Sequence, residues 1–150
     1  MSELTGRNIL VVGASGALGA EFVRQLTAQG ASVIATSSSS ESASRIPAEA
    51  ASKFVLNLED QRSIREFADH LTDAGVTLDG VVLATGLVAF GLAAETPIAI
   101  TERLMKVNFL GQVSAVSSLL PILEQSAAAL VAGLPGVDVI EPELMQAIEL

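Results

Sequence analysis

The 150-residue sequence contains no cysteine, no tryptophan and no tyrosine, and it has a single histidine, His70. Without cysteine there can be no disulfide framework and no thiolate chemistry, and one histidine cannot build a histidine-rich metal site. We therefore expect no metal centre. His70 falls in a polar stretch with helical character, and we interpret it as an exposed structural residue.

Basic residues are also scarce. Eight Lys and Arg stand against seventeen Asp and Glu, which gives a formal net charge of −9. Because nucleic-acid surfaces hold phosphates with clustered basic side chains, we expect no nucleic-acid partner. The N-terminus has neither the basic start nor the apolar core of a secretory signal, and no apolar run reaches the ~20 residues of a membrane span. We expect a cytoplasmic protein without a membrane partner.

Half of the residues are apolar, which is enough for one domain with a substantial core over residues 1–150. Short β-branched runs alternate with longer amphipathic stretches, a pattern typical of βαβ units and a parallel sheet. We predict strands at 7–12, 31–36, 53–57, 80–85 and 128–132, and helices at 17–29, 40–45, 60–74 and 97–125. Right-handed crossovers then give an α/β fold with a doubly wound sheet in strand order 3-2-1-4-5. We also expect Gly30 to end the first helix and Asp60 to cap the third.

Three glycines interrupt the chain between the first expected strand and its helix, at Gly13, Gly16 and Gly19. Gly13 would permit the turn, Gly16 would let the backbone approach a pyrophosphate, and Gly19 would allow the helix to pack closely. The N–H groups of the helix start would face the anion. The expected phosphate contacts are Gly13, Ser15, Gly16, Ala17, Leu18 and Gly19. The alternative is a structural strand-to-helix turn without a ligand.

A serine-rich stretch begins at Ser37 and Ser38, directly after the second expected strand. A dinucleotide-binding fold meets the adenosine ribose at this place, and an Asp or Glu there would repel a 2′-phosphate. The two serines offer neutral hydrogen bonds, which favours NADP over NAD. Arg45 is a candidate partner for the phosphate. A flexible loop is the alternative interpretation of this stretch.

Residues 7–132 resemble the short-chain dehydrogenase/reductase family of NAD(P)-dependent oxidoreductases. After the glycine motif, Asn57-Leu58 stands where the family contacts adenine. Leu83-Ala84-Thr85-Gly86 keeps the last glycine of the family's Asn-Asn-Ala-Gly motif, and Val107-Asn108-Phe109 matches its helix asparagine. The resemblance implies a three-layer Rossmann-type domain that lacks the family's last strands, with NADP or NAD bound along Asn57, Leu58, Ala84, Thr85 and Gly86.

Asn108 is the one candidate catalytic residue. In the family this position holds a helix kink and a water connected to the catalytic lysine. Because Asn is unfavourable inside a helix, some contact should compensate for it. A merely polar helix face is the alternative. The glycine spacing also departs from the commonest family pattern and is more like that of its extended or atypical branch, whereas the expected helix and strand lengths suit the shorter branch, so both branches stay open.

The family's acid–base chemistry has no counterpart in this sequence. The resemblance calls for a Tyr, a Lys four residues later and a Ser, yet there is no Tyr, no Ser stands near 134–136, and Lys53 and Lys106 both lie upstream. A phenol with a pKa near ~10 needs its lysine neighbour to work near neutrality, and no residue here substitutes for the pair. The chain by itself is therefore expected to be inactive.

Three functional interpretations stay open. The chain can be the cofactor-binding part of an oxidoreductase acting on a carbonyl or alcohol, a non-catalytic dinucleotide-binding or sensing protein, or an interaction module with a vestigial glycine loop. Apolar residues of the helix around 101–125 either cover the chain's own sheet or form a homo-oligomer interface, as the family implies. Residues 133–150 stay unassigned, although Glu141-Pro142-Glu143 resembles a helix start.

Overall fold

A single parallel sheet forms the centre of the molecule. The computed structural model describes residues 4–126 and 129–132. The strands are β1 (Asn8–Val12), β2 (Ser32–Ser37), β3 (Ser52–Val55), β4 (Gly80–Leu83) and β5 (Ala129–Ala132), in the order β3-β2-β1-β4-β5. All four neighbouring pairs are parallel. The predicted fold class and strand order are confirmed, and each strand lies within two residues of its predicted bounds.

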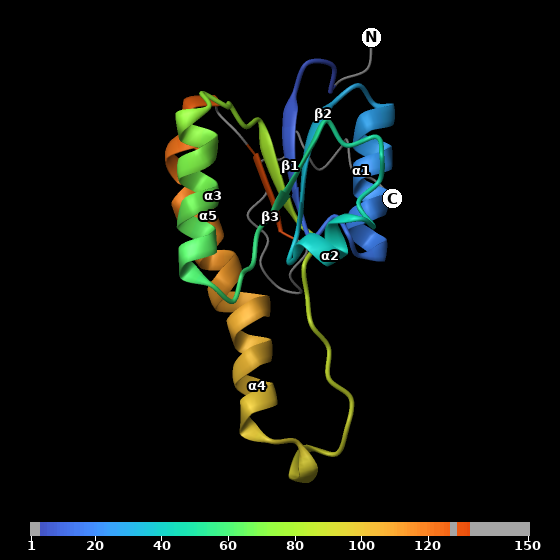
Figure 1. Cartoon of the computed structure of the whole chain (residues 1–150), viewed down its shortest axis with the longest axis vertical. Helices are drawn as coiled ribbons and strands as arrows, with labels where there is room; N and C mark the ends of the chain where they lie inside the picture. The colour runs from blue at the N-terminus through green and yellow to red at the C-terminus, as the bar shows by residue number, and fades with distance from the viewer. Residues whose placement is uncertain (1–3, 127–128, 133–150) are drawn as a thin grey trace.

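Helices cover both faces of the sheet (Figure 1). Helices α1 (Ala17–Ala28) and α2 (Ser40–Ala43) lie on one face, and α3 (Gln61–Asp73) and α5 (Gly111–Leu123) lie on the other. Strand β1 supplies both cores, because Leu10 and Val12 join the cluster under α3 and α5 while Ile9 and Val11 join the cluster under α1. This burial on both faces explains why the strand reads as an unbroken apolar run.

The predicted end of α1 at Gly30 and the predicted start of α3 at Asp60 are both confirmed. Gly30 adopts a φ of 89° directly after the last turn of α1, a left-handed conformation that glycine adopts without strain. The Asp60 side chain accepts a hydrogen bond from the Arg62 N–H at 2.9 Å and caps α3. His70 is exposed on α3, with its ring 5.2 Å from that of Phe54. The terminal helix considered for residues 133–150 lies outside the described residues.

The helix predicted at 97–125 is present over residues 98–126, but it is less regular than expected. It consists of α4 (Ile98–Met105), a π-helical turn η2 (Lys106–Leu110), α5 and a 3₁₀ turn η3 (Glu124–Ser126). Another 3₁₀ turn, η1 (Ala93–Glu95), precedes it and was not predicted. Helix α4 and the connection from β4 extend beyond the end of the sheet (Figure 1).

Length and composition alone would allow the continuous helix Ile98–Ser126 to cross a membrane. It has 29 residues, and its most apolar 18-residue window has a mean hydropathy of 1.2 and is 39% buried. Its polar side chains nevertheless contact the rest of the domain. The Ser114 hydroxyl donates to Gln61 Oε1 of α3 at 2.6 Å, and Arg103 pairs with Glu59. These contacts fasten the helix to the sheet and to α3.

Gly111 lets this helix approach the turn after β3. A Cβ at Gly111 would collide with the Leu58 carbonyl oxygen, and it would lie 2.8 Å from Leu58 Cβ and 2.9 Å from the Lys106 carbonyl oxygen. Two of these atoms are backbone, which cannot move aside cheaply. The missing side chain therefore sets the distance between the helix and the carboxyl edge of the sheet.

Replacing Gly111 with Ala tests this packing. An alanine normally stabilises a helix interior by about 1 kcal/mol relative to glycine. Here we expect Gly111→Ala to lower the free energy of unfolding by about 1–3 kcal/mol, because the added methyl group overpacks the contact. Urea denaturation measures the change. Gly91→Ala is the control, since its Cβ would lie 3.5 Å from Thr96 Oγ1, and a stabilised Gly111→Ala chain would contradict the prediction.

Candidate functional site

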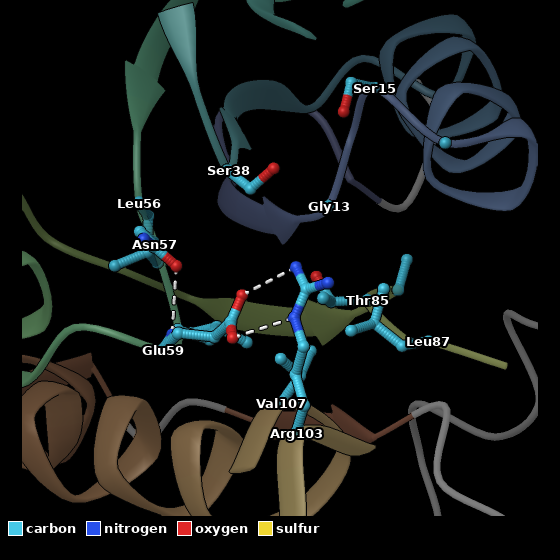
Figure 2. Close-up of a pocket in the computed structure, with 14 residues that line it drawn as sticks. Gly13, Ser15, Ser38, Leu56, Asn57, Glu59, Thr85, Leu87, Arg103 and Val107 are labelled. Carbon is cyan, nitrogen blue, oxygen red and sulfur yellow. Dashed lines mark hydrogen bonds and ion pairs between the residues drawn. The ribbon is translucent and has the colours of Figure 1, made fainter. Parts of the chain in front are cut away.

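A pocket of about 200 Å³ lies at the carboxyl edge of the sheet (Figure 2). Its walls are the residues that directly follow β1, β2, β3 and β4, together with two side chains of the long helix. The lining residues are Gly13, Ser15, Gly16, Ser38, Leu56, Asn57, Leu58, Glu59, Ala84, Thr85, Gly86, Leu87, Arg103 and Val107. In a doubly wound sheet, ligands bind at this edge beside the first strand.

Two of the three motif glycines are required by the fold itself. Gly13 has a φ of +86°, and a Cβ there would collide with the Thr85 hydroxyl and lie 3.0 Å from the Ala84 carbonyl oxygen. A Cβ at Gly19 would collide with the Gly13 carbonyl oxygen. The close packing predicted for Gly19 is thus present, between the first turn of α1 and the loop before it.

Gly16 is different, because nothing in the described protein requires a glycine there. Its backbone lies at φ −81° and ψ 164°, which any residue can adopt, and a Cβ would meet only the Gly13 carbonyl oxygen at an ordinary 3.5 Å. Gly16 lines the pocket and precedes α1, whose N-terminus has no side-chain cap. The open space beside Gly16 and the free N–H groups of the helix start suit an anion.

Ser38, directly after β2, lines the pocket, whereas Ser37, the last residue of β2, is buried behind the pocket wall. Ser37 is 1% exposed, and its hydroxyl donates to the Ser39 carbonyl oxygen at 2.9 Å. Ser39 and Ser42 form a capping box at the start of α2, so the second half of this serine-rich stretch begins a short helix. Arg45 does not line the pocket. A ribose contact remains a prediction for both serines, with Ser38 the better placed.

A tight turn follows β3 and carries Asn57 and Leu58. Asn57 Oδ1 accepts a hydrogen bond from the Glu59 N–H at 3.0 Å, and the Asn57 N–H donates to Ser63 Oγ at 3.0 Å. The Asp60 N–H donates to the Asn57 carbonyl oxygen at 3.1 Å. These local bonds fix the turn at the edge of the pocket, where the adenine contact was predicted.

Two amide side chains of the long helix form hydrogen bonds to the backbone of the loop after β4. Asn108 Oδ1 accepts from the Leu87 N–H at 2.7 Å, and Asn108 Nδ2 donates to the Leu87 carbonyl oxygen at 2.8 Å. One turn later, Gln112 Nε2 donates to the Thr85 carbonyl oxygen at 2.8 Å. The contact expected to compensate for an asparagine inside a helix is therefore Leu87, and Asn108 acts on the pocket through that backbone.

The two charged side chains that line the pocket pair with each other. Arg103 Nε donates to Glu59 Oε1 at 3.0 Å and Arg103 Nη2 to Glu59 Oε2 at 3.0 Å (Figure 2). The hydrogen bond from Arg103 holds the pKa of the Glu59 carboxyl below its ordinary value, although partial burial opposes this shift. Glu59 is therefore ionised at neutral pH, and the pocket wall carries no net charge.

Nine of the fourteen predicted site residues line the pocket: Gly13, Ser15, Gly16, Ser38, Asn57, Leu58, Ala84, Thr85 and Gly86. Ala17 and Leu18 are exposed on the first turn of α1, and Gly19, Ser37 and Asn108 support the wall from behind. Sequence reasoning missed Glu59, Arg103 and Gln112. The spacing of Arg103, Val107 and Gly111 was a usable signal, because residues four apart share a helix face.

Comparison with known proteins agrees with this geometry. Residues 7–132 match the profile described as short chain dehydrogenase. The chain belongs to the short-chain dehydrogenase family. The resemblance noted in the sequence is thus confirmed over the same residues.

Solved structures of short-chain dehydrogenases superpose well. One from Shigella flexneri 2a, complexed with NADP, is 28% identical with a TM-score of 0.77, over 86% of this chain and 59% of that one. One from Escherichia coli CFT073 is also 28% identical with a TM-score of 0.77, over 86% and 61%. An NAD⁺-bound xylitol dehydrogenase, 18% identical with a TM-score of 0.79, shares the fold over 87% and 54%. The chain thus spans about half to three fifths of these proteins.

One curated protein shares a short stretch with this chain. A UPF0173 metal-dependent hydrolase from Ruegeria pomeroyi is 77% identical over 30 residues, which is 20% of this chain and 13% of that protein. Among residues 4–126 and 129–132, no group of three or more His, Cys, Asp or Glu could hold a metal ion. A stretch this short does not transfer the hydrolase's chemistry to the short-chain dehydrogenase domain.

The Glu59–Arg103 pair should make stability depend on pH in one direction. Because the pKa of Glu59 is depressed in the folded protein, the pair's contribution is present above the ordinary value of 4.5 and is lost as pH falls through the folded pKa. We expect Arg103→Gln to lower the melting temperature at neutral pH and the difference to shrink below 4.5. Thermal melts across pH measure this. In a Glu59→Gln background, the effect of Arg103→Gln should not vary with pH over this range, and a persistent pH dependence would exclude Glu59 as its source.

Proposed function

We propose that this domain binds a dinucleotide, NADP(H) in preference to NAD(H), as the cofactor-binding part of a short-chain dehydrogenase. The observation that carries the proposal is Gly16. Its conformation and its surroundings tolerate a side chain, yet it borders the pocket and the uncapped start of α1. A group from outside the chain that approaches the backbone here explains the glycine.

The remaining contacts follow from the strand order. Gly13 and Gly19 shape the loop, and the N–H groups of Ala17 and Leu18 at the helix start would face the pyrophosphate. Ser38 would lie at the adenosine ribose, and Asn57 and Leu58 would border the adenine. Ala84, Thr85 and Gly86 would underlie the adenosine side, on a loop whose backbone Asn108 and Gln112 hold in place.

Two features support NADP over NAD. The end of β2 presents the neutral Ser38 where an acidic residue would repel a 2′-phosphate, and the one carboxylate on the pocket wall, Glu59, is neutralised by Arg103. The Shigella flexneri relative is complexed with NADP. We infer the same preference for this chain.

We further propose that this chain binds the cofactor without turning over a substrate. A bound nicotinamide supplies or accepts hydride, but reduction of a carbonyl or oxidation of an alcohol also needs a proton donor or acceptor. The sequence has no tyrosine, and the Asn108 amide is engaged by Leu87. In a longer protein, a Tyr-x-x-x-Lys pair would supply this chemistry; on its own, the chain would act as a dinucleotide-binding or sensing protein.

Calorimetric titration with NADPH and with NADH tests the proposal. We expect saturable binding of both, tighter for NADPH, and no oxidation of NADPH with a panel of carbonyl substrates. Gly16→Val should abolish binding without unfolding the chain, because its side chain would occupy the space left for the phosphates. No heat with either dinucleotide would mean that the glycine loop is vestigial.

Two further glycine variants test whether Gly16→Val loses binding through the pocket and not through loss of stability. Gly91→Val places the same side chain in a non-helical segment outside the pocket and should bind NADPH as the unaltered chain does. Gly13→Val should also lose binding, but through strain and collision with Thr85, so its melting temperature should fall as well. Equal melting temperatures for Gly13→Val and Gly16→Val would contradict the different roles assigned to the two glycines.

A homo-oligomer is a second proposal, carried by the outer face of the long helix. Leu119 is buried against the chain's own sheet, but Phe109, Leu110, Val113 and Leu120 are between 45% and 55% exposed. Apolar side chains gathered on one face favour association.

Sedimentation equilibrium tests the association. We expect a mass above the monomer that falls on dilution, and a shift towards monomer for Val113→Glu, which places a charge on the exposed face. Ala28→Glu is the control for an added charge, since Ala28 is exposed on α1, which lies on the opposite face of the sheet. A monomer mass that does not change with concentration would contradict the proposal.

A further inference from the structure

One helix face forms a whole wall of the pocket. Arg103, Val107 and Gly111 are spaced by four residues and therefore lie above one another on the helix. Gly111 touches the Leu58 backbone, Val107 lines the pocket, and Arg103 pairs with Glu59. The turn after β3 thus contacts the helix at two places, Gly111 and Arg103, and Val107 lines the pocket between these two contacts.

The pairing leaves part of the Arg103 guanidinium unused. Glu59 takes the Nε and Nη2 donors in a bidentate arrangement. Among the residues that the structure describes, Nη1 has no hydrogen-bond partner, and Figure 2 shows this nitrogen directed away from Glu59 into the pocket. A guanidinium has five donors in a fixed plane, so holding two of them fixes the direction of the others.

Glu59 is itself held in place. Its N–H donates to Asn57 Oδ1 at 3.0 Å, and its side chain is about one third exposed, at 30%, whereas that of Arg103 is 60% exposed. The carboxylate is therefore the less exposed partner, fixed to the tight turn, and the longer arginine side chain is ordered against it. The pair presents a preset cationic donor on the pocket wall formed by the turn after β3.

We propose that Arg103 is a ligand-binding residue of this pocket, and that Glu59 is the positioning residue that aims its Nη1 donor at an acceptor atom on the adenosine diphosphate half of the bound dinucleotide. The inference rests on the proposed function. It assigns the pocket's cationic contact to Arg103, where the sequence had offered Arg45, which does not line the pocket.

The acceptor is either a phosphate oxygen or a nitrogen of the adenine ring, since both accept hydrogen bonds from a guanidinium. Titrations with adenosine and with ADP separate the two. A weakening on Arg103→Gln that appears with ADP but not with adenosine identifies a phosphate contact, and equal weakening with both identifies the base.

Calorimetric titration of the full chain with NADPH and ADP tests the assignment. Arg103→Gln should weaken binding of both about tenfold, the effect of losing one charged hydrogen bond. Glu59→Gln should weaken it about threefold, because the arginine stays but is no longer aimed. The double variant should bind more weakly than Glu59→Gln but no more weakly than Arg103→Gln, since it lacks the arginine and also lacks the carboxylate that Arg103→Gln leaves unpaired on the pocket wall. Arg103→Lys should fall between the two, because an ammonium cannot hold both carboxylate oxygens and keep a directed donor.

A matched control separates this role from stability. Arg62 forms an ion pair with Glu66 on α3 at 2.6 Å, outside the pocket, so Arg62→Gln should leave ligand affinity unchanged. Arg103 variants that bind both ligands as the unaltered chain does, while Gly16→Val does not bind, would overturn the Arg103 assignment alone. Tighter binding in Glu59→Gln would also overturn it, since Glu59 would then act only as a repelling charge. Absence of binding by the unaltered chain would overturn both proposals.

Discussion

The attachment of the long helix to the carboxyl edge of the sheet is the constraint on which the pocket depends. Two sets of contacts make this attachment. Gly111 and Arg103 hold the turn after β3, and Asn108 and Gln112 hold the loop after β4. The π-helical turn Lys106–Leu110 contains Asn108 and separates Arg103 from Gly111 and Gln112. Such turns commonly occur at functional sites, where the altered helical phase lets side chains meet partners that a regular helix would miss.

The three motif glycines show that one sequence pattern can combine different physical requirements. Gly13 is required because its backbone is left-handed and lies close to Thr85. Gly19 is required because α1 packs closely on the loop that precedes it. Both would be needed in a strand-to-helix turn that bound nothing. Within the part of the chain that the structure describes, Gly16 alone of the three has no neighbour and no backbone angle that requires a glycine. The ligand hypothesis therefore rests on the middle glycine, a distinction that spacing in the sequence cannot make because all three residues look alike there.

Features set by local periodicity could be predicted from the sequence, and features set by distant pairs could not. The strands were found because apolar runs alternate with amphipathic stretches, and Asp60 and Gly30 because caps depend on residues within one turn. Asn108 was singled out because an interior asparagine needs a partner, but Leu87 could not be named as that partner. The Glu59–Arg103 pair joins residues 44 positions apart, and Gln112 reaches a carbonyl 27 positions away. Such contacts exist only once the tertiary fold brings the elements together.

Binding of an anionic cofactor and proton transfer make different demands on the groups that line a pocket. The groups that we propose for holding an anionic dinucleotide are backbone N–H groups, small residues and the Arg103 guanidinium, which also neutralises the Glu59 carboxylate on the described pocket wall in a chain with a formal net charge of −9. Proton transfer near neutrality requires a group whose pKa is moved towards the working pH. Glu59 is the carboxyl group that lines the described pocket, and Arg103 moves its pKa the other way. The arrangement that makes the pocket suitable for a cofactor thus also removes Glu59 as a general acid.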